Sequence, residues 1–409
     1  MEQKLNQSII LITSSFPFGN NEVWAIDELS NLIHHGANLT IIPVRIKGKI
    51  NNIEAEKFRK NVIKVPLINI STIHALLKKI IVEPIFIGAS ILELSRQSDS
   101  FKHFVKNLIV LPKICFLLDL LKNKDIRHIH AYSTTTAAVV AGMLSQRIAV
   151  PWSFTLHSSS KLKLANKKSF FYQSQSATRI RTISKTSQIE VNNFLGGDKE
   201  SKIRAIHLGV KLNNTISSDY VKSSNIIIAT PAKYELHKGH IYAIEAAHLL
   251  VKSGYINFKW FFYGSGSLET RLIKFSNELG LSDNCIFAGN VDRQILLEKY
   301  KSREIDIVVS SSITTEDAFE GIPVSLMEAM SFGIPVVATD CGATSELVGN
   351  NSGFLINERS ELELYTALSS LINNYESRIE IGQNGRRRIL DEFNSFNNAK
   401  ELYEFLNYE

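Results

Sequence analysis

Cysteine is scarce in this chain of 409 residues, and the few cysteines lie far apart. There are three, Cys115, Cys285 and Cys341, with no Cys-x-x-Cys pair. This pattern excludes a disulfide framework, argues against a structural zinc site and favours a reducing compartment. We therefore expect a cytoplasmic protein.

Long apolar runs are also absent. No window holds ~18 uninterrupted apolar residues, so a membrane-spanning helix is not expected. The apolar run at residues 9–12 is too short for the core of a signal peptide and is predicted to be a strand. With 44% apolar and 21% charged residues, the composition is that of a globular chain, and its length suits two domains.

Charge is unevenly distributed between the two halves. Residues 1–215 hold 29 Lys+Arg and 14 Asp+Glu (+15), and residues 216–409 hold 17 and 26 (−9), which sum to the net charge of +6. The basic half is suited to nucleic acid, anionic lipid or a phosphorylated substrate, or it is an ordinary solvated surface. Because no basic stretch interleaved with aromatic residues is present, we do not expect a nucleic-acid partner.

Short apolar runs alternate with helical stretches, and this alternation occurs twice. It is typical of parallel sheets covered on both faces, so we predict an α/β fold with two doubly wound, Rossmann-like domains. The predicted domains are residues 1–208 and 209–385, followed by a C-terminal helix in 386–409 that packs back on the first domain. Ligands bind such sheets at the carboxyl ends of the strands, so a cleft between the domains is the expected active site.

Residues 66–121 interrupt this alternation. They are strongly apolar but are broken by lysines, arginines and prolines, which predicts two or three amphipathic helices with basic flanks. Such helices bury their apolar face in the first domain or lie on an anionic membrane surface, and the two possibilities are compatible with each other.

The most informative segment begins at Glu320 and contains Glu328. Pro323 suits the first turn of a helix and Gly333 suits a left-handed cap, which predicts a helix over residues 323–332. The free N–H groups of its first turn form an anion site for a diphosphate, and the two carboxylates can accept hydroxyls of a sugar and a ribose. The alternative is that one glutamate faces the helix dipole and the other is a surface residue.

Two further loops each follow a strand and precede a helix. In the first, Lys233 and Lys238 can reach a diphosphate, unless they are merely solvated. In the second, Gly264 and Gly266 permit close approach of a ligand or form a plain tight turn.

The first half offers weaker candidates. His157 ends a predicted strand and therefore faces the expected cleft, although an isolated histidine is more often structural. Phe16 and Glu22 lie in the loop after the first strand, which binds an acceptor or is an ordinary connection. His128 and His130 share one face of a strand, but the sequence offers no third ligand, so a metal site is rejected.

These residues resemble a known family. Two glutamates separated by seven residues, in the context Glu320-Gly-Ile-Pro-Val-Ser-Leu-Met-Glu-Ala-Met330, are similar to the motif of glycosyltransferase family 4. Members of that family have the GT-B fold and are retaining enzymes. The motifs Lys238-Gly-His240, Tyr263-Gly-Ser-Gly266 and Ile206-His-Leu-Gly-Val210 continue the match. The first half looks most like the colanic-acid and amylovoran type of exopolysaccharide transferases.

The resemblance implies a retaining glycosyltransferase that takes a nucleotide-sugar donor and a lipid-linked or glycan acceptor, without a metal or other cofactor, in the cytoplasm or at the inner face of an anionic membrane. Lys233 stands where the family usually has an arginine, so it lacks the bidentate fork. The alternatives are a nucleotide-sugar 2-epimerase and a non-catalytic sugar-nucleotide or polymer-binding subunit. The implied catalytic residues are His157, Glu320 and Lys238; those binding the donor are Lys233, Lys238, Gly264, Gly266, Glu320, Gly321, Ile322, Pro323, Val324, Ser325 and Glu328; and those binding the acceptor are Phe16, Glu22 and His157.

Overall fold

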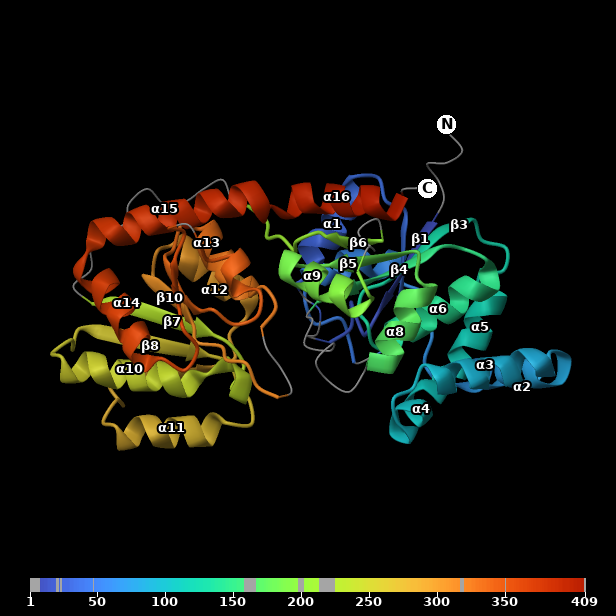
Figure 1. The fold of residues 1–409 in the computed structure, drawn as a ribbon, viewed down its shortest axis with the longest axis horizontal. Helices are drawn as coiled ribbons and strands as arrows, with labels where there is room; N and C mark the ends of the chain where they lie inside the picture. Colours follow the sequence, from blue (N-terminus) through green and yellow to red (C-terminus); the bar gives the residue numbers. More distant parts are fainter. Residues whose placement is uncertain are drawn as a thin grey trace. The chain divides into compact units, whose positions relative to one another are not determined.

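The computed structural model describes residues 8–19, 22, 24–46, 48–157, 167–197, 202–212, 225–316, 320–349 and 351–407. The chain forms two compact units, one made of residues 1–207 and 396–409 and the other of residues 208–395. Each contains a six-stranded parallel sheet with helices on its faces, which confirms the predicted fold class (Figure 1). Most of the polar stretch after residue 212 lies outside the described residues.

The sheet of the first unit has the strand order β2-β1-β3-β4-β5-β6. Its first strand shows why the sequence reads as a continuous apolar run, because alternate side chains enter different cores. Ile10 and Ile12 pack on one face, while Ile9 and Leu11 pack on the other. The strands are β1 (Ser8–Thr13), β2 (Leu39–Pro43), β3 (Ile126–Ala131), β4 (Trp152–Leu156), β5 (Arg179–Thr182) and β6 (Ile203–Ala205), and the helices around them are α1 (Ala25–His34), α6 (Thr136–Ile148), α8 (Lys167–Ser176) and α9 (Lys185–Phe194).

The sheet of the second unit has the order β12-β11-β10-β7-β8-β9. The chain builds outward from β7 through β8 and β9, and then returns to the other side of β7 with β10. The carboxyl ends of β7 and β10 therefore flank the point where the strand order reverses, which is where open α/β sheets bind ligands. The strands are β7 (Ile226–Pro231), β8 (Phe258–Tyr263), β9 (Cys285–Gly289), β10 (Ile307–Ser310), β11 (Val336–Thr339) and β12 (Phe354–Ile356), and the helices are α10 (His240–Lys252), α11 (Glu269–Glu278), α12 (Arg293–Lys301), α13 (Val324–Ser331), α14 (Glu361–Asn373) and α15 (Tyr375–Glu392).

The helical insertion of the first unit contains a buried helix and three exposed ones. The helices are α2 (Ile70–Val82), α3 (Pro84–Arg96), α4 (Phe101–Leu108) and α5 (Leu111–Leu121). On α5 the buried Lys113 donates hydrogen bonds to the carbonyl oxygens of Pro43, Val44 and Val65, at 2.5, 3.2 and 2.6 Å. In Figure 1, α2, α3 and α4 project from the layered part of the unit. No helix in the described ranges is both long and apolar enough to cross a membrane.

The C-terminal segment differs from the prediction in where it leaves the second unit. The expected C-terminal helix began at residue 386, but α15 continues to Glu392 as part of the second unit. The reason is that Arg386 and Arg388 donate hydrogen bonds to the backbone carbonyls of Ser331 and Glu346, which fixes this helix there. The segment that joins the first unit starts at residue 396, within α16 (Ser395–Asn407), whose apolar side chains pack in the same core as α1.

Candidate functional site

A cavity of about 390 Å³ opens in the second unit at the reversal of strand order. The loop after β7 and the end of β10 form its walls, and the start of α13 closes it. Six of the predicted site residues line this cavity: the charged Lys233, Lys238 and Glu320, together with Pro323, Val324 and Ser325. The other described lining residues are Pro231, Ala232, Glu235, His237, Val309 and Ser310.

The N-terminus of α13 supplies backbone donors to this cavity. Pro323 is extended (φ −73°, ψ 111°) and precedes the first helical residue, and its own side chain does not cap the helix. Val324 and Ser325, in the first turn, line the cavity. Because the first N–H groups of a helix have no partner within it, and the helix dipole adds partial positive charge, this position attracts an anion. Of the other predicted residues here, Ile322 is buried beside Gly321.

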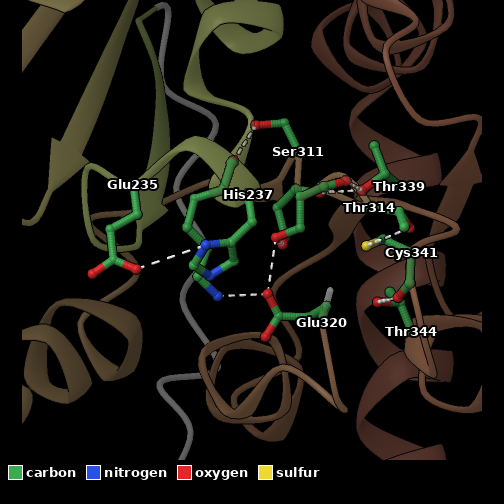
Figure 2. A network of polar contacts seen from close by, with 11 residues as sticks. Glu235, His237, Ser311, Thr314, Glu320, Thr339, Cys341 and Thr344 are labelled. Atoms are coloured by element: carbon green, nitrogen blue, oxygen red, sulfur yellow. Dashed lines mark hydrogen bonds and ion pairs between the residues drawn. The ribbon is translucent and has the colours of Figure 1, made fainter. Parts of the chain in front are cut away.

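Lys238 and Glu320 form an ion pair at the edge of the cavity. The Nζ of Lys238 lies 2.5 Å from Oε2 of Glu320, and the Ser312 hydroxyl donates to the same oxygen at 2.9 Å. Figure 2 shows the Glu320 carboxylate at the centre of these contacts. Burial alone would raise the pKa of Glu320, but the ammonium and the hydroxyl more than offset it, so the pKa lies below 4.5. The carboxylate is therefore ionised at neutral pH.

The loop that carries Lys238 is held by a close backbone contact. Gly239 has φ +62°, and a Cβ atom on it would lie 1.9 Å from the carbonyl oxygen of Ser311. Only glycine permits this approach between the loop after β7 and the loop after β10. The contact positions Lys238 beside Ser312 and Glu320, so this glycine acts through the backbone.

Gly264 and Gly266 support the Lys233 loop and do not form part of the described cavity lining. A Cβ on Gly264 would lie 2.0 Å from the Ala232 oxygen, and one on Gly266 would lie 2.5 Å from the Tyr234 oxygen. At both glycines another backbone segment approaches where a Cβ would stand, and the approach of a ligand stays a prediction. Their role is to hold the loop on which Lys233 sits.

Glu328 is buried on α13, where it pairs with Arg293. The Nε of Arg293 lies 2.5 Å from Oε1 of Glu328, and only 6% of Glu328 is exposed. Sequence reasoning missed Arg293, since a first residue of a helix gives no motif signal. The guanidinium fixes one oxygen of the carboxylate in a partly buried setting.

His157 lies at the carboxyl end of β4 in the first unit and is partly buried. Its Nε2 is 2.8 Å from the carbonyl oxygen of Tyr132, which follows β3. The Trp24 ring stacks on Tyr132 (centroids 5.4 Å apart) and meets His157 edge-on (4.5 Å). The imidazole is thus held by an aromatic cluster at the strand ends, where the sequence placed it.

A buried ionic group that the sequence did not reveal lies beneath this cluster. The Arg181 guanidinium donates to both oxygens of Glu28, at 2.8 and 2.5 Å, and the Tyr132 hydroxyl also donates to Glu28. All three residues are at most 2% exposed. Burial would raise the pKa of Glu28, but Arg181 and Tyr132 hold it below 4.5. The group ties α1 to β5 and to the end of β3.

The structure gives Phe16 and Glu22 structural partners. Phe16 is 1% exposed and packs edge-on against Phe58 at 5.3 Å, so its ring lies in the core and not at a surface for an acceptor. The Glu22 carboxylate accepts hydrogen bonds from the backbone N–H groups of Ser14, Ser15 and Phe16, at 3.2, 3.0 and 3.0 Å. The expected acceptor-binding pair instead shapes the loop after β1.

His128 and His130 are buried and share the Ser153 hydroxyl, at 2.6 and 2.7 Å. Burial lowers the pKa of both, that of His128 to about 3, so both imidazoles are neutral. Within the ranges that the structure describes, no group of three or more His, Cys, Asp or Glu side chains is arranged to hold a metal ion.

Known proteins resemble part of this chain in sequence and nearly the whole chain in fold. Residues 214–388 match the family described as glycosyl transferases group 1. The amylovoran biosynthesis glycosyltransferase AmsK of Erwinia amylovora is 32% identical over 181 residues, 44% of each chain. The putative colanic acid biosynthesis glycosyltransferase WcaL of Escherichia coli is 29% identical over 215 residues, 51% of this chain and 52% of that one. Thus the match spans about half the length of these curated relatives.

The crystal structure of Anabaena Alr3699/HepE in complex with UDP-glucose superposes with a TM-score of 0.72 over 98% of this chain and 100% of that one, at 16% identity. At this identity the likeness establishes the fold, and the matched residues 214–388 contain the cavity with its lysines and its glutamate. The protein therefore has the GT-B fold, and its residues 214–388 are a domain of the glycosyl transferases group 1 family.

Proposed function

We propose that this chain is a retaining glycosyltransferase. It transfers a sugar from a nucleotide-sugar donor to a lipid-linked or glycan acceptor in the assembly of a bacterial surface polysaccharide. The observation that carries the proposal is the cavity in which Lys233, Lys238 and the N-terminus of α13 meet. The names of AmsK and WcaL, and the UDP-glucose bound to HepE, support the class of donor and product.

The cavity has the charges that a departing diphosphate requires. Two ammonium groups and the first N–H groups of α13 surround the same space. Fixed donors at the place where negative charge develops lower the barrier to leaving-group departure, and one such group commonly contributes about 2.7–4 kcal/mol. In this proposal a metal is not required, and turnover in the presence of EDTA tests that part.

Glu320 and Glu328 are proposed to bind hydroxyl groups of the donor. When a diphosphate takes over the Lys238 ammonium, the Glu320 carboxylate is released to accept hydrogen bonds from the sugar. Arg293 holds one oxygen of Glu328, and that carboxylate is proposed to bind the ribose. His157 is the proposed catalytic contact in the first unit, where Tyr132 and Trp24 orient its ring.

A thermal-shift screen of the full chain against nucleotide sugars tests the proposal. A donor that binds only the folded state, at a concentration 100 times its Kd, adds about 2.7 kcal/mol to the free energy of unfolding and so raises the melting temperature. Release of nucleoside diphosphate that requires an acceptor separates a transferase from an epimerase and from a binding subunit. NMR of the product shows whether the sugar keeps the anomeric configuration that it has in the donor, which tests the retaining mechanism. If no nucleotide sugar shifts the melting temperature, the proposal fails.

The exposed helices α2 and α3 are proposed to dock on an anionic bilayer. Ile70, Ile81 and Ile85 are 88%, 80% and 87% exposed, and the exposed Lys78 lies on α2 between the first two of them in the sequence. Apolar side chains flanked by lysines are complementary to a surface of anionic headgroups over hydrocarbon. The proposal places the protein at the inner face of the cytoplasmic membrane.

A further inference from the structure

A second cavity, of about 270 Å³, lies in the first unit among α4, α6 and α8. Its described lining is mostly cationic and hydroxylic: Lys102, His103 and Lys106 from α4, the threonines of residues 134–136 at the start of α6, and Ser169 from α8. This combination of cations and hydroxyl donors is typical of a site for a phosphate group.

The start of α6 and the side chain of Ser169 on α8 supply hydrogen-bond donors to this cavity. Thr135 precedes the first residue of α6, and its own side chain does not cap that helix. Ser169 is buried, and its hydroxyl accepts a hydrogen bond from Gln173 Nε2 at 3.2 Å, which leaves its own proton to be donated. The cavity therefore offers both hydroxyl and backbone donors.

A carboxylate that contacts two residues of the cavity lining already has partners. Asp99 accepts hydrogen bonds from the backbone N–H groups of Lys168 and Ser169, at 3.0 and 3.3 Å, and its other oxygen lies 3.2 Å from His103 Nδ1. It therefore serves the start of α8 and orients the imidazole. Since Lys102 and Lys106 together carry two positive charges against this single negative one, the cavity keeps a net positive charge.

An exposed apolar stripe runs beside the lysines on the same helix. Phe101 and Val105 precede Lys102 and Lys106 by one position each, so both pairs are one turn apart on adjacent faces of α4. Phe101 is 80% exposed and Val105 is 41% exposed. A ligand whose phosphate enters the cavity can thus lay an attached hydrocarbon chain on this stripe.

The cavity also lies close to the proposed catalytic histidine. Thr134 is two residues beyond Tyr132, whose carbonyl oxygen contacts His157. A chain of hydroxyls from Ser14 through Ser133 to Thr135, with distances of 3.4 and 2.8 Å, continues along the same strand ends.

We propose that this cavity binds the phosphate or diphosphate of a lipid-linked acceptor, with Lys102 and Lys106 contacting the phosphate and the Phe101 stripe contacting the lipid. This rests on the proposed transferase function, because it names the acceptor of that reaction. The lysines hold the acceptor by its phosphate, and the sugar-bearing end extends from the cavity.

The test is a titration of the full chain with decyl diphosphate and with inorganic pyrophosphate. Every variant in this titration also carries Lys238→Gln, which weakens diphosphate binding in the second unit. Against this background, Lys102→Gln/Lys106→Gln is expected to raise the Kd for decyl diphosphate about tenfold or more, since two charge-assisted contacts are lost. The matched control, Lys60→Gln/Lys124→Gln, removes two exposed lysines of the same unit and leaves the Kd unchanged.

The two probes distinguish a lipid-linked phosphate from a free one. Tighter binding of decyl diphosphate than of pyrophosphate supports the lipid-linked acceptor, whereas equal affinities overturn that part. Equal affinity of the Lys102/Lys106 variant and its control overturns the site. Binding of nucleotide sugars is also measured with the chain that keeps Lys238. If nucleotide sugars do not bind this chain, the proposed function is contradicted. The cavity is tested separately, by whether binding of decyl diphosphate depends on Lys102 and Lys106.

Discussion

The ammonium nitrogen of Lys238 lies 2.5 Å from the Oε2 oxygen of Glu320. In the free chain, the cation proposed to hold the diphosphate is therefore neutralised by the carboxylate proposed to hold the sugar. Donor binding must exchange this ion pair for two new contacts, one with the phosphate and one with the sugar. The pair keeps both side chains in the cavity before the donor arrives.

Replacing Lys238 by glutamine is expected to lower kcat about 10²–10³-fold, because a fixed cation at the departing diphosphate is lost. Release of nucleoside diphosphate measures the effect. Lys274→Gln is the control, since this exposed lysine of the same unit pairs only loosely with Glu278, at 3.7 Å. A Lys238 variant that keeps wild-type turnover would remove the lysine from the mechanism.

Arg293 and Glu328 are expected to act as a unit in nucleotide binding. Glu328→Gln and Arg293→Gln should each weaken binding of the nucleoside diphosphate, with a coupling energy of about 0.5–3 kcal/mol in a double-mutant cycle. Calorimetric titration of the four proteins gives this value. Additive effects, or affinities that do not change, would show that the ion pair only stabilises the helices α12 and α13.

The sheets could be predicted from the sequence because their strands are continuous apolar runs. The apolar run at residues 9–12, which was predicted to be a strand, lies within β1. The strand β12 has only three residues, and a run this short carries no periodic signal in the sequence. The end of the second unit was also misplaced, because arginine contacts to distant carbonyls decide it.

The candidate site was predictable only where local motifs carry it. Lys238 and Glu320 each stand in a recognisable loop, and the fold brings them together. Arg293 became visible only through its contact with Glu328, 35 residues away along the chain. Similarly, the close contact of the glycines after β8 with the neighbouring backbone became visible only in the structure.

Glu28→Gln is expected to destabilise the first unit by about 3–5 kcal/mol, since it leaves the Arg181 guanidinium buried without its charge partner. The pKa of Glu28 is lowered in the folded state, so its stabilising contribution is present above the unfolded value near 4.5 and is lost as the pH falls through the folded value. Urea unfolding of both proteins from neutral to acidic pH measures this. The difference in free energy of unfolding between the wild type and the variant should become smaller below about pH 4.5. A difference that does not change with pH would contradict a role for the ionised Glu28 carboxylate.

Substitution of the exposed isoleucines of the insertion is expected to release the chain from anionic vesicles. In Ile81→Ser/Ile85→Ser, two side chains that are 80% and 87% exposed no longer enter the bilayer, and each buried methylene contributes about 0.8 kcal/mol. Sedimentation with phosphatidylglycerol vesicles measures the bound fraction. Because the lysines act through screened charge, raising the salt concentration should lower binding of the wild-type chain as well.

The matched control for this experiment is Ile256→Ser/Ile295→Ser, which removes two exposed isoleucines, 69% and 54% exposed, from the second unit. It should sediment with vesicles as the wild type does. Equal loss in both variants would mean that general surface apolarity drives binding, and binding to neutral phosphatidylcholine as strong as to anionic vesicles would remove the role of the lysines. A specific loss in the insertion variant, sensitive to salt, assigns membrane docking to α2 and α3 and leaves the cavity beside α4 to receive the acceptor's phosphate from the same bilayer.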